Sequence, residues 1–258
     1  MQSSFSTKSA LAMPFLRTTA LACGFAIVLG VFNLPASANR EQVRQGLPGR
    51  RISGGVRSQC FQDATKSFQS LVAITPRNLL GKTAEAHPTF WFSLPETQST
   101  KTINFELFDS ADNIVYSNNV EQSHASGLSK VELPPTTKGL TPGENYRWVL
   151  DIKCESDPEY SSLEVQGWVR RVEISTDLSS QIASASLAEQ AYLYEEAGLW
   201  HEQVTALAEL RNLQPESIEA QLKWAALIQA SGLDSHIPNS PLETTIGVMD
   251  SKTARTEP

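Results

Sequence analysis

One ten-residue stretch, NYRWVLDIKC, constrains the fold of this chain most strongly. Within it, aromatic and aliphatic side chains recur at every second position: Tyr146, Trp148, Leu150, Ile152 and Cys154. Successive side chains of a β-strand point to opposite faces, so this period places all of them on one apolar face. The sequence therefore predicts a β-strand here, with a Cys154 that is either disulfide-bonded or buried.

Similar short runs, separated by turn signals, extend from Thr89 to Ile174. Apolar residues alternate in TFWFSLP and in TINFELFD, and DSADN separates the second run from IVYSNNV, as in a β-hairpin. Pro142 and Gly143 fit the central positions of a type II turn. This pattern predicts an antiparallel, β-sandwich-like domain over residues 58–174.

The last predicted strand, SLEVQGWVRRVEI, changes phase near its end. Leu163 and Val169 belong to one phase, whereas Val172 belongs to the other. A β-bulge or an edge bend near Gly167–Arg171 accounts for this change.

A binding surface is predicted from exposed aromatic and basic residues of the β domain. Trp91 is out of phase with its apolar neighbours, and Trp168 lies beside the proposed bulge with Arg170 and Arg171. Exposed tryptophans can stack on sugar rings or anchor a protein partner. In the plainer interpretation, a second sheet and the helices cover the tryptophans, and the arginines protect a sheet edge.

The period becomes helical after Asp177. Alanine, leucine and glutamate dominate, and the pattern predicts three helices: Leu187–Ala197, Trp200–Leu213 and Glu216–Ser231. Their spacing resembles a tetratricopeptide repeat. Its small, aromatic, glycine, aromatic, large apolar and proline positions are occupied, in this order, by Ala191, Tyr194, Gly198, Trp200, Leu207 and Pro215. Residues 177–233 are therefore predicted to form a tetratricopeptide-like helical hairpin.

One and a half repeats cannot form a solenoid, because each repeat needs neighbours that bury its faces. The helices must cover the β domain, pair with another copy, or dock on a partner. Residues 234–258 are polar and lack periodicity, which predicts a disordered tail.

The N-terminus predicts export. Lys8 and Arg17 flank an apolar run of about fifteen residues, and Ala36-Ser37-Ala38 forms an A-x-A site, so residues 1–38 are typical of a signal peptide cleaved after Ala38. An uncleaved anchor is the alternative, although a membrane helix needs roughly twenty apolar residues. After cleavage we expect a periplasmic or secreted protein that has no stable membrane span.

The segment 39–57 contains five arginines and one glutamate, which predicts a basic flexible linker or a handle for an acidic partner. Without Lys8 and Arg17, the chain has 19 basic and 28 acidic residues, a formal charge of −9. This balance argues against nucleic acid as a partner.

Two cysteines, Cys60 and Cys154, remain after the predicted cleavage. An even number of cysteines in an exported protein favours a disulfide, and a small buried side chain is the alternative for each.

No residues of the sequence form a recognisable catalytic, cofactor-binding or metal-binding motif. The four histidines make no H-x-x-x-H pair, and no Cys-x-x-Cys, G-x-S-x-G or phosphate-binding glycine motif occurs. His87 is predicted to cap a turn, and His201 to lie in solvent at a helix start. We therefore expect no enzyme and no cofactor.

Several segments together resemble the cyanobacterial family known as domain of unknown function 928. The resemblance rests on HPTFWFSLP, FELFDSADNIVY, LPPTTKGLTPGENYRWVLDIKC, VQGWVRRVE and YEEAGLWHEQVTALAELR, in this order. It implies an exported protein with a β domain followed by helices, and it implies no activity.

Three functions are compatible with the sequence. The first is an exported, non-catalytic protein-interaction module whose partner is an envelope or secreted protein. The second is a glycan-binding β-sandwich for envelope or extracellular polysaccharide, and the third is a hydrolase with dispersed catalytic residues.

Overall fold

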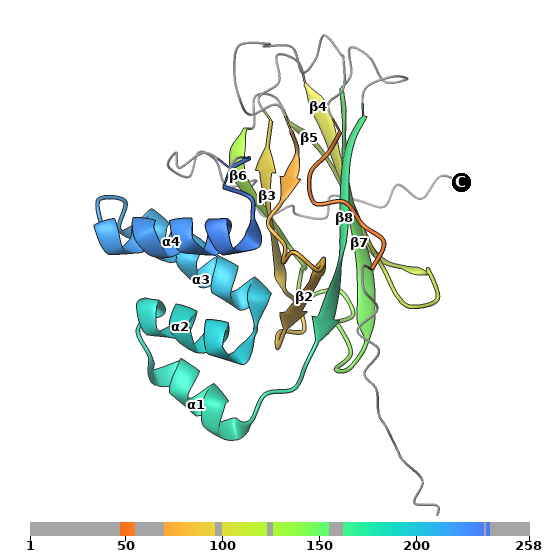
Figure 1. Ribbon diagram of the computed structural model, residues 1–258. Coiled ribbons are helices and arrows are strands. Elements are labelled where there is room, and N and C mark those ends of the chain that lie inside the picture. Colours follow the sequence, from red (N-terminus) through yellow and green to blue (C-terminus); the bar gives the residue numbers. More distant parts are fainter. Residues whose placement is uncertain are drawn as a thin grey trace, which may run out of the picture. The chain divides into compact units, whose positions relative to one another are not determined.

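The computed structural model describes residues 47–54, 70–95, 100–122, 126–154, 162–234 and 236–237. Eight strands precede four helices in this part of the chain (Figure 1). The strands are β1 (Val72–Ala73), β2 (Leu80–Thr83), β3 (Thr89–Leu94), β4 (Lys101–Phe108), β5 (Ile114–Gln122), β6 (Gly127–Glu132), β7 (Asn145–Cys154) and β8 (Ser162–Arg171). The helices are α1 (Thr176–Ser184), α2 (Leu187–Ala197), α3 (Trp200–Leu213) and α4 (Ile218–Ser231).

The strands form two sheets, which confirms the expected β-rich part in outline. One sheet has the order β2-β8-β7-β4-β5 and the other the order β1-β3-β6. The prediction of a purely antiparallel domain is wrong at one edge, because β2 pairs with β8 in parallel. Parallel neighbours need a long connection, and here nearly the whole β part of the chain separates the two strands.

Both predicted turns are present. β4 and β5 form an antiparallel hairpin, whose loop is closed by the Asp109 carboxylate accepting from the backbone N–H groups of Ala111 and Asn113. Gly143 adopts φ +84° in the turn that follows Thr141, the conformation that a type II turn requires at this position.

The predicted bulge near the end of β8 is wrong. β7 and β8 stay in continuous register from Asn145 opposite Arg170 to Lys153 opposite Ser162. The apparent change of phase arises because β8 ends at Arg171, so Val172 lies beyond the strand. Gly167 keeps the inward phase of Leu163 and Val169 and lies opposite Trp148. A Cβ atom at Gly167 would lie 2.4 Å from Trp148 Cζ2, so the indole fills the space that a side chain would take.

The main core lies between the two sheets. It contains the alternating apolar residues of β3, β4, β7 and β8, and Trp148 packs edge-on against Phe92 at 5.6 Å between ring centroids. The face of β7 predicted from its period of two is this buried face.

A second core lies between the three-stranded sheet and the helices. Val72, Trp91 and Leu128 come from the sheet, whereas Val204 and Trp224 come from α3 and α4. Both faces of the small sheet are therefore covered, and the helices pack beside β3 and β6 (Figure 1).

The predicted bounds of α2 and α3 are confirmed, and α4 begins two residues later than expected. Ser186 and Glu189 form a capping box at the start of α2, and Gly198 and Gly232 end α2 and α4 with left-handed conformations. Helix α1, which buries no residue, was not predicted. The tetratricopeptide-like arrangement stays a prediction.

Residues 47–54 belong to the folded unit and are not a solvated linker. Arg50 exchanges two backbone hydrogen bonds with Gln166, and Arg51 donates to the carbonyl of Ser231 at 2.7 Å. The rest of the predicted linker, the predicted signal peptide 1–38, Cys60 and most of the predicted tail lie outside the described residues. No helix in the described ranges is long and apolar enough to cross a membrane.

Candidate functional site

Glu202, in the first turn of α3, ties the helices to the turn after β2. Its Oε1 atom accepts hydrogen bonds from Thr83 Oγ1 at 2.7 Å, from the backbone N–H of Ala84 at 2.7 Å and from that of Glu85 at 3.2 Å. The residue is 8% exposed, and Oε2 has no hydrogen-bond partner within the described part of the chain. One carboxylate oxygen is thus saturated, and the other is buried without a donor.

His201 is buried beside Glu202, and its predicted place in solvent is wrong. Its Nδ1–H donates to the carbonyl of Thr89 at 3.0 Å, and its ring packs edge-on against Phe90. Burial lowers the pKa of His201 to about 4, so the imidazole is neutral at neutral pH. The ring fits because Gly81 has no side chain, and a Cβ there would lie 2.5 Å from Nε2.

The buried imidazole predicts a pH dependence of stability. The pKa of His201 is lowered in the folded state, so its contribution to stability is complete above pH 6.5 and is lost as the pH falls towards 4. Between pH 7 and pH 5 we expect this residue alone to lower the free energy of unfolding by about 2 kcal/mol.

The matched variant is His201→Asn, because the asparagine amide can donate to Thr89 as Nδ1 does, yet does not titrate in this range. Urea unfolding of both proteins at pH 7 and pH 5 measures the difference. If the free energy of unfolding fell equally in the two proteins between pH 7 and pH 5, the acid sensitivity would come from other groups.

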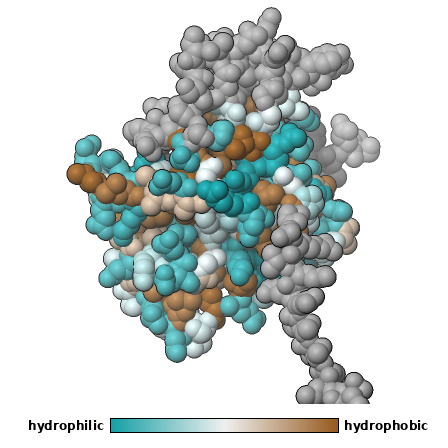
Figure 2. Space-filling view, viewed as in Figure 1, coloured by the Kyte–Doolittle hydropathy of each residue, from teal (hydrophilic) through white to brown (hydrophobic). Residues whose placement is uncertain are grey.

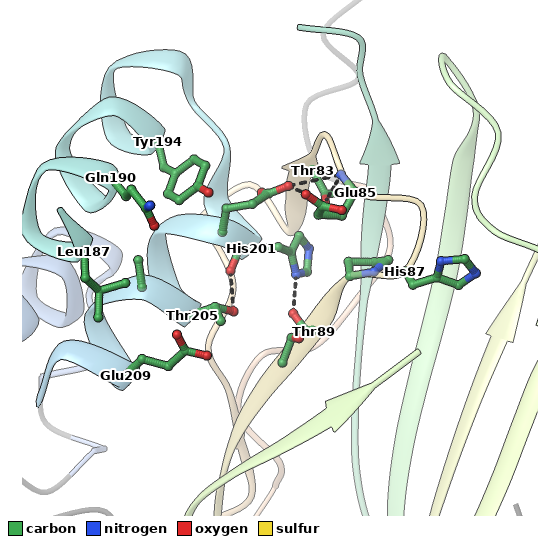
Figure 3. A pocket seen from close by; sticks show the side chains of 13 residues that line it. Thr83, Glu85, His87, Thr89, Leu187, Gln190, Tyr194, His201, Thr205 and Glu209 are labelled. Atoms are coloured by element: carbon green, nitrogen blue, oxygen red, sulfur yellow. Dashed lines mark hydrogen bonds between the residues drawn. The ribbon is translucent and has the colours of Figure 1, made fainter. Parts of the chain in front are cut away.

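A cavity of about 190 Å³ lies where α2 and α3 meet the segment between β2 and β3. Figure 3 shows Tyr194 and Gln190 of α2 on one side of it, and Glu85 and Thr89 on the side of the strands. Three carboxylates line it: Glu85 and Glu209 are exposed and mark its mouth, and Glu202 is buried.

The cavity is acidic. The pKa of the Tyr194 hydroxyl is raised by burial and, next, by the negative charges of Glu202, Glu85 and Glu209. Neither lysine nor arginine lines the cavity, and none of these three glutamates forms an ion pair with another described residue. The described residues contain no group of three His, Cys, Asp or Glu side chains that could hold a metal ion.

A second hollow, the helical groove, lies between α2, α3 and α4. Its volume is about 320 Å³, and Tyr192, Glu195, Leu207, Lys223 and Leu227 are among the residues that line it. Tyr192 is 59% exposed. Hydrophobic side chains lie among hydrophilic ones on the helical part of the surface in Figure 2.

The structure places Trp91, predicted as part of a binding surface, under the helices. It is 7% exposed, and its indole N–H donates to Thr205 Oγ1 of α3 at 3.0 Å. Trp91 does point away from the main core, but the helices cover the face that it occupies. The predicted exposure of Trp91 is therefore wrong, and the plainer interpretation, in which the helices cover the ring, agrees with the structure. A ring buried in this way is not accessible to a sugar.

The other three predicted surface residues lie at the end of β8. Trp168 is half-buried and donates its indole N–H to the carbonyl of Pro48 at 3.0 Å. Arg171 donates to the carbonyls of Ala84 and Leu140, and so joins two loops. Arg170 is partly exposed in the same strand. These residues lie on a different sheet from Trp91, so the four do not form one surface.

The predicted disulfide concerns Cys154 at the end of β7, which is 1% exposed. Cys60 lies outside the described residues. The pairing stays a prediction. His87, predicted to cap a turn, lies within hydrogen-bond distance of the carbonyl of Thr137, with 3.1 Å between Nε2 and the oxygen.

A family model described as Domain of Unknown Function (DUF928) matches residues 52–242, a range that includes every strand and helix described above. The chain belongs to this family. The predicted family is thereby confirmed, and its description assigns no activity.

No curated protein matches this DUF928 chain. One similar solved structure is the crystal structure of Bacteroides uniformis beta-glucuronidase, with 9% sequence identity and a TM-score of 0.23. The match covers 39% of this chain and 12% of the other. A likeness this weak carries no argument about fold or function.

The three carboxylates of the acidic cavity in this DUF928 protein were not singled out from the sequence. Glu202 and Glu209 lie on α3, Tyr194 on α2 and Glu85 after β2, so only the packing of helices on the sheet brings them together. The one available signal was that Glu202 lies in the first turn of a helix, where carboxylates often bind backbone N–H groups.

Proposed function

We propose that this DUF928 protein is an exported, non-catalytic protein-interaction module of the cell envelope, and that its helical groove binds a basic segment of an envelope or secreted protein. The observation that carries this proposal is the groove between α2, α3 and α4, with the exposed ring of Tyr192 at its edge. Exposed apolar patches and aromatic residues are typical of protein interfaces.

The charge of the helices favours a basic partner. Between Thr176 and Asp234 the chain has nine acidic and two basic residues, so most of the net negative charge lies in the helical part. Opposite charge on a partner speeds association and suppresses wrong partners. Apolar side chains such as Leu207 and Leu227 line the groove, and α4 exposes two more outside its lining, Leu222 at 64% exposure and Ile218 at 73%.

Site-specific crosslinking tests the proposal. A photoreactive residue replaces Tyr192 in the groove, and in a matched control it replaces the exposed Glu164 on β8. We expect position 192 alone to trap an envelope protein through a lysine- or arginine-rich segment. We further expect the purified partner to bind more weakly to Tyr192→Ala, and more weakly in high salt. The same adducts from both positions, or binding that Tyr192→Ala leaves unchanged, would contradict the proposal.

Export also predicts a disulfide between Cys60 and Cys154. We expect the protein isolated from its envelope to resist thiol alkylation at both cysteines until it is reduced, and then to take up two labels there. A bridge that closes so long a loop contributes up to about 4–5 kcal/mol in the chain-entropy model. Peptide mapping that finds either cysteine alkylated before reduction would remove the bridge.

A further inference from the structure

The acidic cavity described above has a negative charge that no neighbouring cation balances. Glu85, Glu202 and Glu209 line it, and none of them forms an ion pair with a described residue. Two imidazoles also line the cavity: that of His201 is neutral at neutral pH, and that of His87 has a ring nitrogen within hydrogen-bond distance of the Thr137 carbonyl. Three carboxylates around a small hollow attract a positive group from solution.

One atom in the cavity has an unmet requirement for a hydrogen-bond donor. Glu202 is more than nine-tenths buried, and its Oε2 has no partner in the described ranges, although Oε1 accepts from three donors. Buried polar atoms are nearly always hydrogen-bonded, and a carboxylate accepts only. Oε2 itself is inaccessible to solvent, so a ligand N–H group supplies the missing donor only after a neighbouring side chain shifts to open the way to it.

The shape of the site favours an organic cation over a metal ion. No three potential metal ligands converge among the described residues, so the carboxylates cannot enclose a bare ion together. Tyr194 adds an aromatic ring and a hydroxyl to the lining, and Leu187 adds an apolar wall. An aromatic ring attracts a cation, and an apolar wall suits an alkyl chain.

We propose that this cavity binds the ammonium group of a primary alkyl amine, with Glu202 Oε2 as the buried acceptor and Glu85 and Glu209 at the mouth. A lysine side chain of a protein and a free diamine share this chemistry. The cavity and the helical groove lie on different sides of α2 and α3, so this proposal does not rest on the proposed function.

The test is a titration of the purified protein at pH 7 and low salt, followed by NMR or calorimetry. The probes are Nα-acetyl-lysine amide, cadaverine, and a lysine amide that is also acetylated on its ε-nitrogen and is therefore uncharged. We expect the charged probes to bind and the neutral one to bind at least about tenfold more weakly. Preference for the lysine amide would indicate a protein source for the ligand, and preference for cadaverine a free amine.

Three variants locate the site. Glu202→Gln keeps an oxygen for the donors at Oε1 but removes the charge, and Glu209→Gln removes a charge at the mouth without a hydrogen bond to lose. Glu196→Gln removes an exposed charge from the same pair of helices, outside the cavity. We expect about tenfold weaker binding in the first variant, weaker binding in the second, and no change in the third.

Several results would overturn the proposal. One is that the neutral probe binds as tightly as the charged probes, and another is that neither charged probe binds. A third is that all three variants lose the same binding affinity, which would indicate non-specific attraction to an acidic protein. If Glu202→Gln fails to fold, unchanged binding in Glu209→Gln has the same consequence.

Discussion

Replacing Glu202 with alanine is expected to lower the free energy of unfolding by about 3–4 kcal/mol, the largest single effect anticipated at the boundary between sheet and helices. The substitution removes the acceptor of three hydrogen bonds, from the Thr83 hydroxyl and from the backbone N–H groups of Ala84 and Glu85. Thr83 is fully buried, so its hydroxyl cannot turn to water. Urea unfolding at pH 7 measures the loss.

Glu202→Gln is the matched control, because its amide oxygen still accepts these bonds. We expect it to cost clearly less than the alanine variant. If the two variants were equally unstable, the charge itself, and not its hydrogen bonds, would hold α3 against the turn after β2. If neither were destabilised, the contact would have no part in joining the layers.

Gly167→Val is expected to destabilise the fold by about 3 kcal/mol, although valine is the better strand former. Even the first carbon of a side chain at this position would lie 2.4 Å from Cζ2 of Trp148. Trp148 is 2% exposed and packs against Phe90 and Phe92, so it cannot move aside. The backbone of β8 is held by β7 and β2 on its two sides.

The neighbouring substitution Gln166→Val provides the control, since residue 166 points away from the main core, and we expect a change within about 0.5 kcal/mol. A second test combines Gly167→Val with Trp148→Leu. The double variant should be more stable than the sum of the two single losses implies, because leucine at position 148 is smaller than tryptophan and leaves room for the valine at position 167. Additive losses would mean that the two positions do not compete.

The periodicity of apolar residues and the positions of glycine residues predicted much of the secondary structure. The apolar faces of β4 and β7 follow directly from alternation, because each strand has a core on one side only. The ends of α2 and α4 follow from Gly198 and Gly232, whose left-handed conformations stop a helix.

The features that were missed depend on partners distant in sequence. β2 has four residues and no clear alternation, and it is a strand because β8 provides hydrogen bonds far along the chain. The supposed bulge in β8 arose because Val172 was read as part of the strand, although β8 ends at Arg171. The end of the strand depends on its pairing with β7 and β2, which the local sequence does not show.

The candidate site was least accessible from the sequence. His201 and Glu202 begin a helix and look like ordinary polar residues of its first turn. Their burial follows from the approach of α3 to Gly81, where the missing side chain lets the imidazole lie on the strand. Likewise, the phase of Trp91 indicated correctly that it leaves the main core, but only the helical layer decides that it is covered.

The parallel pairing of β2 with β8 also determines the order in which this chain can assemble. Contacts between residues far apart in sequence form late, because closing a long loop costs entropy before any contact compensates for it. Gly81 and Thr83, on which His201 and Glu202 dock, therefore take their final places only after the last strand has joined the sheet. We therefore expect the helices to dock only on a complete sheet, so a partner that needs them docked would bind only molecules in which β2 and β8 are paired.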